Sequence, residues 1–176
     1  MKHLYFCRHG LSVLGQQGLW AGSTNTSLAK EGRDQAKAAG REAAGLHIDY
    51  IISSPLVRAY DTAAIIAAEI GYSPDKIERN DLVVERNFGE LEGTPWDPTF
   101  NLSSVPSVEP LDSLMDRAQL MADYLETLPH DTILIVSHGS FGRALRDILN
   151  PDITFKGNRL ENAKIMEFIQ KDRGDL

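Results

Sequence analysis

Three short apolar segments, each followed by a helical pattern, constrain the fold of this chain more than any other feature. They are Leu4–Cys7 (LYFC), Asp49–Ser53 (DYIIS) and Thr132–Val136 (TILIV). Apolar runs this short are typical of strands that are buried on both faces of a sheet. Because strands alternate with helices, the sequence predicts a three-layer α/β fold with a mostly parallel sheet and helices on both faces.

The other regular elements follow from the spacing of apolar residues. Weak patterns predict further strands within Lys76–Glu85 and Asn162–Ile169. Residues at helical spacing predict four helices, and small side chains on one face of the first would let it lie close to the sheet. The predicted helices are Ala29–Leu46, Pro55–Ile70, Leu111–Leu128 and Ser140–Leu149.

Composition and charge narrow the class of protein. The chain has 176 residues, 42% of them hydrophobic, and we expect one domain over residues 1–176. The formal net charge of −7 argues against nucleic acid or an anionic membrane as a partner. The first apolar run ends at Arg8, too early for a signal peptide, and no stretch is long enough to span a membrane. The single cysteine, Cys7, cannot form an intrachain disulfide, so a cytoplasmic location is expected.

Residues with catalytic potential follow all three of the clear strands. The first strand leads into Arg8 and His9, and the third leads into His138. The second leads into a helix with Arg58 in its first turn. In an open parallel sheet the carboxyl ends of the strands lie along one edge, where ligands bind. We therefore expect the two histidines and the two arginines to converge on one pocket.

This set of side chains suits the chemistry of a phosphoryl group. Guanidinium groups are forked donors for phosphate, and a neutral imidazole is a good nucleophile toward phosphorus. Arg8 would both bind the phosphoryl group and lower the pKa of His9, which keeps that imidazole neutral. His138 would donate to a phosphoryl oxygen as charge develops. Gly10 and Gly139 would let the backbone approach the anion closely.

Transfer of a phosphoryl group also needs a proton donor for the leaving oxygen. The segment Val83–Gly93 (VVERNFGELEG) offers Glu85, Glu90 and Glu92. A carboxyl group in a partly dry pocket can act as a general acid. The residues alone do not choose among the three.

Five sequence blocks together resemble the histidine phosphatase superfamily, the phosphoglycerate-mutase-like group. Their order and approximate spacing match that family, and the resemblance covers nearly the whole chain. The blocks are RHG (Arg8–Gly10), the passage ending in SLAKEG (Gly22–Gly32), SSPLVRAYDTA (Ser53–Ala63), ERNFGELEG (Glu85–Gly93) and VSHGSFGRAL (Val136–Leu145).

The resemblance implies a phosphoglycerate-mutase-like fold and a role for each matching residue. His9 would become phosphohistidine, and Glu85 matches the proton donor of the family. The family uses no metal for this chemistry, so neither a metal nor a cofactor is expected. The residues expected to bind the phosphorylated substrate are Arg8, Arg58, His138, Gly22 and Gly139.

Two positions depart from the family pattern. Gly15 stands where the family often has an asparagine whose amide touches the phosphate. Ala21 stands where a hydroxyl residue often precedes Gly22. The resemblance therefore predicts weaker binding of phosphate than is usual in the family.

The length of one loop separates two possible reactions. Mutases of the family carry a long segment between the glutamate block and the next helix, whereas here that segment is only Thr94–Pro110. The segments FGELEG (Phe88–Gly93) and EPLDSLMDR (Glu109–Arg117) also resemble the phosphatase branch, which includes α-ribazole-phosphate and fructose-bisphosphate phosphatases. The predicted function is hydrolysis of a phosphomonoester, and the substrate is expected to be a small phosphorylated metabolite. The alternatives are mutase-type phosphoryl transfer and a non-catalytic phosphate-binding module.

Substrate specificity is expected to lie in two loops, Leu11–Thr26 and Thr94–Pro110. Trp20, Trp96 and Phe100 lie in these loops and would either rim the pocket or serve ordinary packing. The sequence indicates neither the individual substrate nor the oligomeric state.

Overall fold

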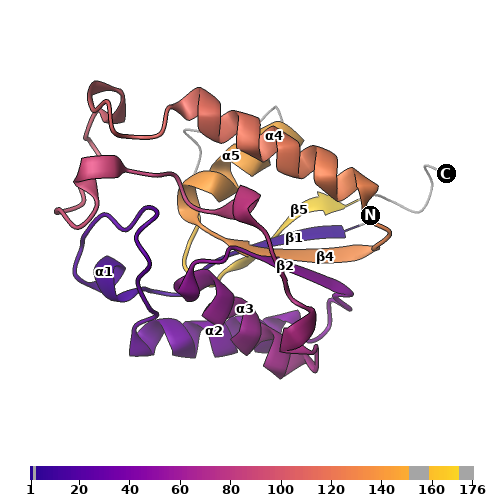
Figure 1. Cartoon of the computed structure of the whole chain (residues 1–176). Coiled ribbons are helices and arrows are strands. Elements are labelled where there is room, and N and C mark those ends of the chain that lie inside the picture. The colour runs from indigo at the N-terminus through magenta and orange to yellow at the C-terminus, as the bar shows by residue number, and fades with distance from the viewer. Residues whose placement is uncertain (2, 151–158, 171–176) are drawn as a thin grey trace.

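A five-stranded sheet lies at the centre of the computed structural model, which describes residues 1, 3–150 and 159–170 (Figure 1). The strand order is β3-β2-β4-β1-β5, and every neighbouring pair is parallel except β1 with β5. The strands are His3–Arg8 (β1), Tyr50–Ser53 (β2), Glu78–Arg79 (β3), Thr132–Ser137 (β4) and Ile165–Gln170 (β5).

The register of the three central strands brings their carboxyl ends to one level. Arg8, the last residue of β1, pairs with Ser137, the last residue of β4. Ser53 at the end of β2 pairs with Val136 of β4. The segments that leave these strands therefore start side by side at one edge of the sheet, as the sequence predicted.

Helices cover both faces of the sheet, which confirms the predicted three-layer architecture. Figure 1 shows α4 and α5 on one side and α2 and α3 on the other. β4 serves both layers, because Ile133 and Ile135 point to the first side and Leu134 and Val136 to the second. The helices are Val13–Gln16 (α1), Lys30–Ala43 (α2), Val57–Ile70 (α3), Leu111–Thr127 (α4) and Gly139–Leu149 (α5).

Small residues on α2, which the sequence predicted to face the sheet, also allow close packing on α3. Ala36, Ala39 and Ala43 are buried, and a Cβ built on Gly40 would lie 2.5 Å from the Cβ of Glu69 on α3. Only a residue without a side chain fits between these two helices at that point. α2 and α3 consequently form one tight layer beneath the sheet.

Three predicted segments differ in detail from the structure. The Lys76–Glu85 segment contains only a two-residue strand, because 3₁₀ turns at Pro74–Lys76 and Asp81–Val83 flank β3. The predicted loop Leu11–Thr26 contains the one-turn helix α1. The last strand is antiparallel and begins three residues later than the predicted start at Asn162.

Two further sequence expectations concern the extent of the chain. Within the described residues, none of the helices is both long and apolar enough to cross a membrane. The expectation of one domain over residues 1–176 stays a prediction, since it includes positions outside the described residues.

The contact between the start of α2 and the loop after β1 gives a test of the fold. A Cβ on Gly32 would collide with the backbone oxygen of Leu11, and a backbone atom cannot move aside as a side chain can. Gly32→Ala should lower the free energy of unfolding by about 2 kcal/mol, measured by urea denaturation. Gly45→Ala is the control, because nothing lies within 4 Å of its Cβ position. Equal effects of the two substitutions would contradict this packing.

Candidate active site

Two histidines meet at the edge where β1 and β4 end. The ring centroids of His9 and His138 lie 5.1 Å apart, and the ring planes are inclined by 62°. The backbone N–H of His9 donates to the carbonyl oxygen of Ser137 (2.9 Å), which extends the strand pairing by one residue. Both side chains are buried, His9 at 5% exposure and His138 at 0%. The predicted convergence of the strand ends is confirmed for this pair.

Arg58 reaches the same point from the first turn of α3, where its side chain is 1% exposed. Its Nε donates to Nε2 of His9 (3.2 Å). Its two terminal nitrogens donate to the carbonyl oxygens of Thr24 (2.8 Å) and Gly22 (2.6 Å). These bonds fix the guanidinium with carbonyl groups and leave its positive charge without a paired carboxylate among its described hydrogen-bond partners.

The hydrogen bonds of His9 determine which ring nitrogen carries the proton. Nδ1 lies 2.6 Å from the carbonyl oxygen of Gly10, which can only accept, so Nδ1 is the protonated nitrogen. Nε2 accepts from Arg58 and therefore presents a lone pair. The ring is thus held as the neutral tautomer with Nε2 toward the pocket.

Burial and neighbouring cations keep both imidazoles neutral. Burial lowers the pKa of His9 well below its usual value, and the nearby Arg58 and Arg8 lower it further. The pKa of His138 is lowered well below its usual value by burial, and then by Arg58 and His9. A neutral imidazole at position 9 is the form that can act as a nucleophile.

Arg8 lies at the end of β1 and faces the beginning of α5. Its Nη1 donates to the carbonyl oxygen of Leu160 (2.9 Å), while its buried Nε has no hydrogen-bond partner among the described residues. A Cβ on Gly139 would lie 3.5 Å from that Nε, so the loop after β4 packs on the guanidinium. Burial, followed by the charge of Arg159, lowers the pKa of Arg8 to about 10, which leaves the group charged at neutral pH.

His138 carries a second buried polar atom without a partner. Its Nε2 lies 2.8 Å from the hydroxyl of Ser54, the residue that follows β2. Its Nδ1 has no hydrogen-bond partner within the described part of the protein. Buried polar groups are nearly always hydrogen-bonded. When the Ser54 hydroxyl, which accepts from the backbone N–H of Leu56, donates to Nε2, the neutral ring carries its proton on Nδ1. In that tautomer Nδ1 of His138 and the unpaired Nε of Arg8 form a pair of donors that an oxyanion would satisfy.

Glu85 is an acidic residue whose charge acts on both Arg8 and Arg58. Its carboxylate accepts from the backbone N–H groups of Ser140 and Phe141 (both 3.1 Å), at the first turn of α5. A carboxylate is favourable there because the N-terminus of a helix carries partial positive charge. The contact fixes Glu85 beside the loop that holds His138, and its side chain also lines the cleft.

The two other glutamates of the same segment lie elsewhere. Glu92 accepts from the side chains of Ser23 and Thr24 and from the backbone N–H of Phe88. Although partial burial acts to raise it, these hydrogen bonds hold the pKa of Glu92 below its usual value. Glu90 is exposed and near Ser107. Among the three candidates, the geometry favours Glu85 as a proton donor.

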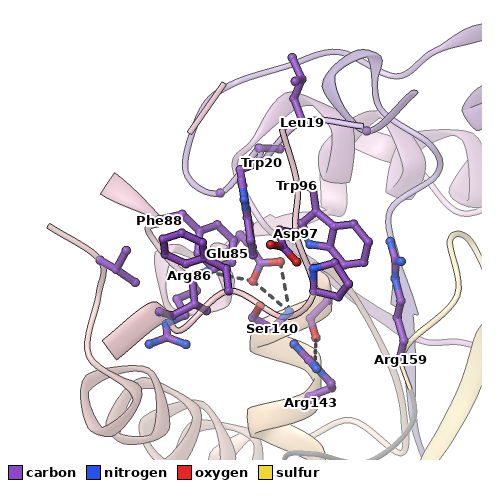
Figure 2. Close-up of a pocket in the computed structure, with 18 of the residues that line it drawn as sticks. Leu19, Trp20, Glu85, Arg86, Phe88, Trp96, Asp97, Ser140, Arg143 and Arg159 are labelled. Carbon is purple, nitrogen blue, oxygen red and sulfur yellow. Dashed lines mark hydrogen bonds between the residues drawn. The ribbon is translucent and has the colours of Figure 1, made fainter. Parts of the chain in front are cut away.

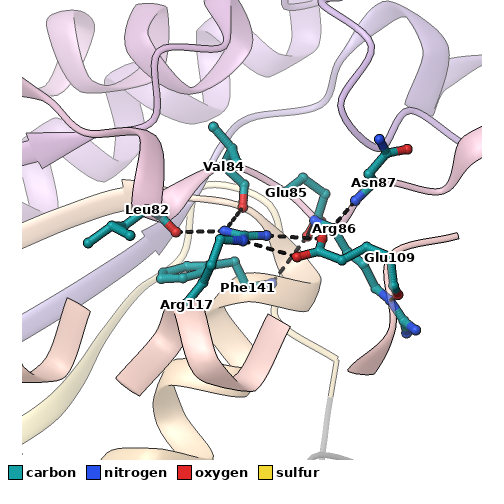
Figure 3. Close-up of polar contacts among 8 residues, drawn as sticks. All are labelled: Leu82, Val84, Glu85, Arg86, Asn87, Glu109, Arg117 and Phe141. Atoms are coloured by element: carbon teal, nitrogen blue, oxygen red, sulfur yellow. Dashed lines mark hydrogen bonds and ion pairs between the residues drawn. The ribbon is translucent and has the colours of Figure 1, made fainter. Parts of the chain in front are cut away.

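An ion pair holds the segment around Glu85 in place (Figure 3). Arg117 of α4 contacts both carboxylate oxygens of Glu109, at 3.0 and 3.1 Å. Its Nη1 also donates to the carbonyl oxygens of Leu82 (2.6 Å) and Val84 (3.1 Å). Glu109 in turn accepts from the backbone N–H of Asn87 (3.0 Å). The pair therefore fixes the backbone on both sides of Glu85.

A cleft of about 1030 Å³ extends from Arg8 and His9 toward the two loops in which the sequence predicted specificity (Figure 2). The buried side chains of Arg58 and His138 contact His9 but are not among the described residues that line the cleft. The loops are joined by backbone hydrogen bonds from Trp20 N to Thr94 O (2.9 Å) and from Trp96 N to Gly18 O (2.8 Å). Trp20 packs on Phe88 in a small apolar cluster, with ring centroids 4.6 Å apart. All three aromatic residues named from the sequence line the cleft, and Trp96 and Phe100 are each 41% exposed there.

Two glycines that the sequence placed near the substrate, Gly22 and Gly10, shape the backbone around the site. Gly22 has a φ of 49°, and its carbonyl oxygen accepts from Arg58, so it positions that arginine as well as lining the cleft. A Cβ on Gly10 would collide with the backbone of Gly32, so Gly10 serves helix packing rather than contact with an anion. Gly15 and Ala21, the two departures from the family pattern, also line the cleft.

Several neighbours of the site were not identified from the sequence. Asn162 donates from Nδ2 to the carbonyl oxygen of His9 (2.7 Å) and so fixes the end of β1. Ser54 contacts His138, and Arg143 and Arg159 line the cleft. Ser54 and Arg143 lie inside the sequence blocks that resemble the family, so their position could have indicated a place near the site. The other two lie far along the chain from any block.

Comparison with known proteins identifies the family. A sequence model of the histidine phosphatase superfamily (branch 1) matches residues 4–174. The chain belongs to this superfamily. The predicted resemblance is confirmed, and His9, His138, Arg58 and Glu85 all lie on the blocks that carried it.

Curated members of the superfamily include both phosphatases and mutases. The uncharacterized phosphatase PhoE of Bacillus subtilis is 32% identical over 93% of this chain and 86% of its own length. A 2,3-bisphosphoglycerate-dependent phosphoglycerate mutase of Brucella anthropi is 32% identical over 82% of this chain and 79% of its own length. The chain spans only 39% of the length of another relative, the agropine synthesis reductase of Rhizobium rhizogenes, at 29% identity.

A solved structure supports the predicted fold. The crystal structure of a phosphoglycerate mutase from Bacillus anthracis aligns with a TM-score of 0.81 over 94% of this chain and 86% of that chain, at 22% identity. This superfamily member therefore has a phosphoglycerate-mutase-like fold.

The ion pair behind Glu85 should stabilise the folded protein. Arg117→Met leaves the mostly buried carboxylate of Glu109 unpaired and removes two bonds to backbone carbonyls, so the free energy of unfolding should fall by about 3 kcal/mol. Arg33→Met removes a more exposed pair with Asp61 and should cost less than about 1 kcal/mol. Urea denaturation measures both, and equal losses would contradict a structural role for the buried pair.

The two neutral histidines make stability depend on pH. In the unfolded chain histidines titrate near pH ~6.5, whereas burial and nearby arginines hold the folded pKa values of His9 and His138 well below that. The unfolded state thus binds more protons as the pH falls below ~6.5, and stability present above that pH is lost. Each group contributes up to about 1.4 kcal/mol per pH unit. His138→Asn should reduce this slope by about half a proton at pH ~6.5 and by nearly one proton at pH ~5.5. An unchanged slope would contradict burial of the neutral ring.

Proposed function

We propose that this protein hydrolyses phosphomonoesters through a phosphohistidine intermediate on His9. The observation that carries the proposal is the state of that ring: a neutral tautomer with Nε2 directed at Arg58 and lying beside His138. Histidine in this form can attack phosphorus, and the surrounding cations can bind the phosphoryl oxygens. The phosphatase PhoE, similar over most of its length, supports hydrolysis.

In the first step, Nε2 of His9 attacks phosphorus in line with the leaving oxygen. The N–P bond forms as the P–O bond breaks, and the carboxyl group of Glu85 gives its proton to the leaving alkoxide. The products of this step are an alcohol, phosphohistidine and an ionised Glu85. The bonds from the first turn of α5 then stabilise the carboxylate that has formed.

In the second step, water attacks phosphohistidine. Glu85 accepts a proton from the water, the N–P bond breaks, and inorganic phosphate leaves with the imidazole neutral again. Glu85 ends each cycle in the protonated form with which it began, so atoms and protons balance over one turnover.

The buried donors stabilise the transferred phosphoryl group. Arg58 turns its Nε–H from the ring of His9 to a phosphoryl oxygen when substrate binds. The Nε of Arg8 and the Nδ1 of His138 have no partners within the described residues, and they donate to the remaining oxygens as charge develops. With Arg8 and Arg58 supplying the positive charge, the reaction needs no metal. We place the enzyme in the cytoplasm, acting on a small phosphorylated metabolite.

Hydrolysis rather than mutase transfer is supported by the loop over the cleft, residues Thr94–Pro110, here named the cover loop. The loop Thr94–Pro110 is short, and two of its aromatic residues, Trp96 and Phe100, remain partly exposed. Such a cover admits water to the phosphohistidine. The phosphoglycerate mutase among the relatives makes transfer the second candidate. With 3-phosphoglycerate, release of inorganic phosphate supports the first function, and conversion to 2-phosphoglycerate without release supports the second.

The mechanism predicts distinct effects for two substitutions. His9→Ala should abolish the acid-labile, base-stable phosphoenzyme formed from labelled substrate and lower kcat by at least ~10³-fold. Glu85→Gln should lower kcat by about 10²-fold on an alkyl phosphate, and much less on p-nitrophenyl phosphate, whose leaving group needs no proton. Both assays are run with and without EDTA, which should have no effect.

Glu90→Gln is the matched control, because Glu90 is an exposed carboxylate of the same segment. It should behave as the wild type on both substrates. Turnover by His9→Ala at the wild-type rate would overturn the mechanism. Vanadate binding without any hydrolysis that depends on His9 would instead support a phosphate-binding module.

A further inference from the structure

The cleft is much larger than a phosphate group, and an arginine stacked on a tryptophan lies in its outer part (Figure 2). The guanidinium carbon of Arg159 lies 4.8 Å from the ring centroid of Trp96. Trp96 belongs to the loop Thr94–Pro110, whereas Arg159 lies far later in the sequence, shortly before β5. The pair therefore joins the cover to the edge of the sheet.

The backbone next to Arg159 is tied directly to the catalytic strand. Leu160 is 2% exposed, and its carbonyl oxygen accepts from Nη1 of Arg8. Ala163 donates from its backbone N–H to the carbonyl oxygen of Arg8 (2.7 Å), and Asn162 binds the carbonyl oxygen of His9. These bonds hold Arg159 at a defined place beside the phosphate-binding end of the cleft.

The cleft is positively charged although the chain is acidic. The whole chain has 18 lysines and arginines against 25 aspartates and glutamates. Among the described residues that line the cleft there are four arginines and only two acidic residues, Glu85 and Asp97. Glu85 caps α5, and Asp97 accepts from Thr99. The arginines are Arg8, Arg86, Arg143 and Arg159.

No carboxylate is paired with the Arg159 guanidinium within the described part of the chain. Over the described residues it makes neither a hydrogen bond nor an ion pair through its guanidinium, and its contact is the face of Trp96. Its charge also repels that of Arg8, whose pKa is lowered first by burial and then by Arg159. Keeping such a cation beside Arg8 is unfavourable in the free protein. An anion bound between them would relieve the repulsion.

We propose that Arg159, stacked on Trp96, binds a second anionic group of the substrate, separate from the phosphoryl group that His9 receives. The substrate is then an organic phosphomonoester that also carries a carboxylate or a second phosphate, with a body that packs on the aromatic side chains of the cover. A guanidinium held over the face of an indole keeps N–H groups free for a forked contact with either oxyanion. This inference rests on the proposed function, since it names the substrate class of the same site.

The test compares three esters that share one body: phenyl phosphate, 4-carboxyphenyl phosphate and the 1,4-bisphosphate of hydroquinone. For the wild type, kcat/KM should be at least ~10-fold higher for the best charged ester than for phenyl phosphate, mainly through KM. The more favoured of the two charged esters identifies the second group as carboxylate or phosphate. In Arg159→Ala the charged-to-neutral ratio should fall to about 2 or less, and Arg159→Lys should restore part of it.

Arg41→Ala is the matched control, because it removes one exposed arginine from α2 and changes the net charge equally. It should keep the wild-type ratio. Equal kcat/KM values for the three esters in the wild type would overturn the inference. So would an equal fall for charged and neutral esters in Arg159→Ala, or a loss of the ratio in Arg41→Ala, which would indicate a general effect of charge.

Binding of phosphonates separates this inference from the proposed function. Phenylphosphonate and 4-carboxyphenylphosphonate have a P–C bond that is not hydrolysed, so calorimetry measures their affinity without turnover. Tighter binding of the carboxylated compound, by about 10-fold and dependent on Arg159, supports the second anion site for a carboxylate. If the wild type cleaves none of the esters, hydrolysis fails as a function, and the phosphonate pair still decides whether Arg159 binds an anion.

Discussion

The parallel pairing of β1 with β4 is the constraint on which the site depends. Because Arg8 pairs with Ser137, the residues that follow, His9 and His138, leave the sheet side by side. The pairing continues through the backbone bond from His9 to Ser137. A shift of β1 by one residue against β4 would turn the side chain of His9 to the opposite face of the sheet, away from His138. The geometry of the histidine pair is thus a property of the main chain and not of either side chain alone.

The cations of the site are held by uncharged groups. Arg58 donates to the carbonyl oxygens of Gly22 and Thr24, and Arg8 donates to that of Leu160. Carbonyl groups fix a guanidinium without cancelling its charge, whereas a carboxylate partner would compete with phosphate. The carboxylate of Glu85 lies nearby, but it is engaged by the first turn of α5. The arrangement keeps positive charge available in a protein whose net charge is negative.

Much of the fold and of the inner site could be predicted from the sequence. Apolar strands followed by His9 and His138 carry a local signal, and Arg58 lies at a fixed distance after a strand. The short strand β3 was overestimated, because 3₁₀ turns on either side of it leave only a weak apolar pattern.

The residues that hold the catalytic side chains in place could not be predicted. Arg117 lies in the quoted segment Glu109–Arg117, but its bonds to the carbonyl oxygens of Leu82 and Val84 join residues far apart in the chain. The contact of Arg159 with Trp96 is equally distant, and such contacts leave no pattern in the sequence. Among the three glutamates, the residues themselves left the choice open. The contact of Glu85 with α5 separates it from Glu92, which is tied to the loop of Ser23 and Thr24.

The small apolar cluster of Trp20, Phe88 and Val108 is separate from the two cores that flank the sheet. Its members come from the two cleft loops and from the segment that follows Glu85, so substitutions of Trp20 or Val108 lie away from the strand ends. Because this cluster is separate from the strand ends, substitutions in it can change which metabolite binds while the phosphoryl-transfer residues stay in place. Divergence among relatives would then be concentrated in the cover, while the inner histidines and arginines persist.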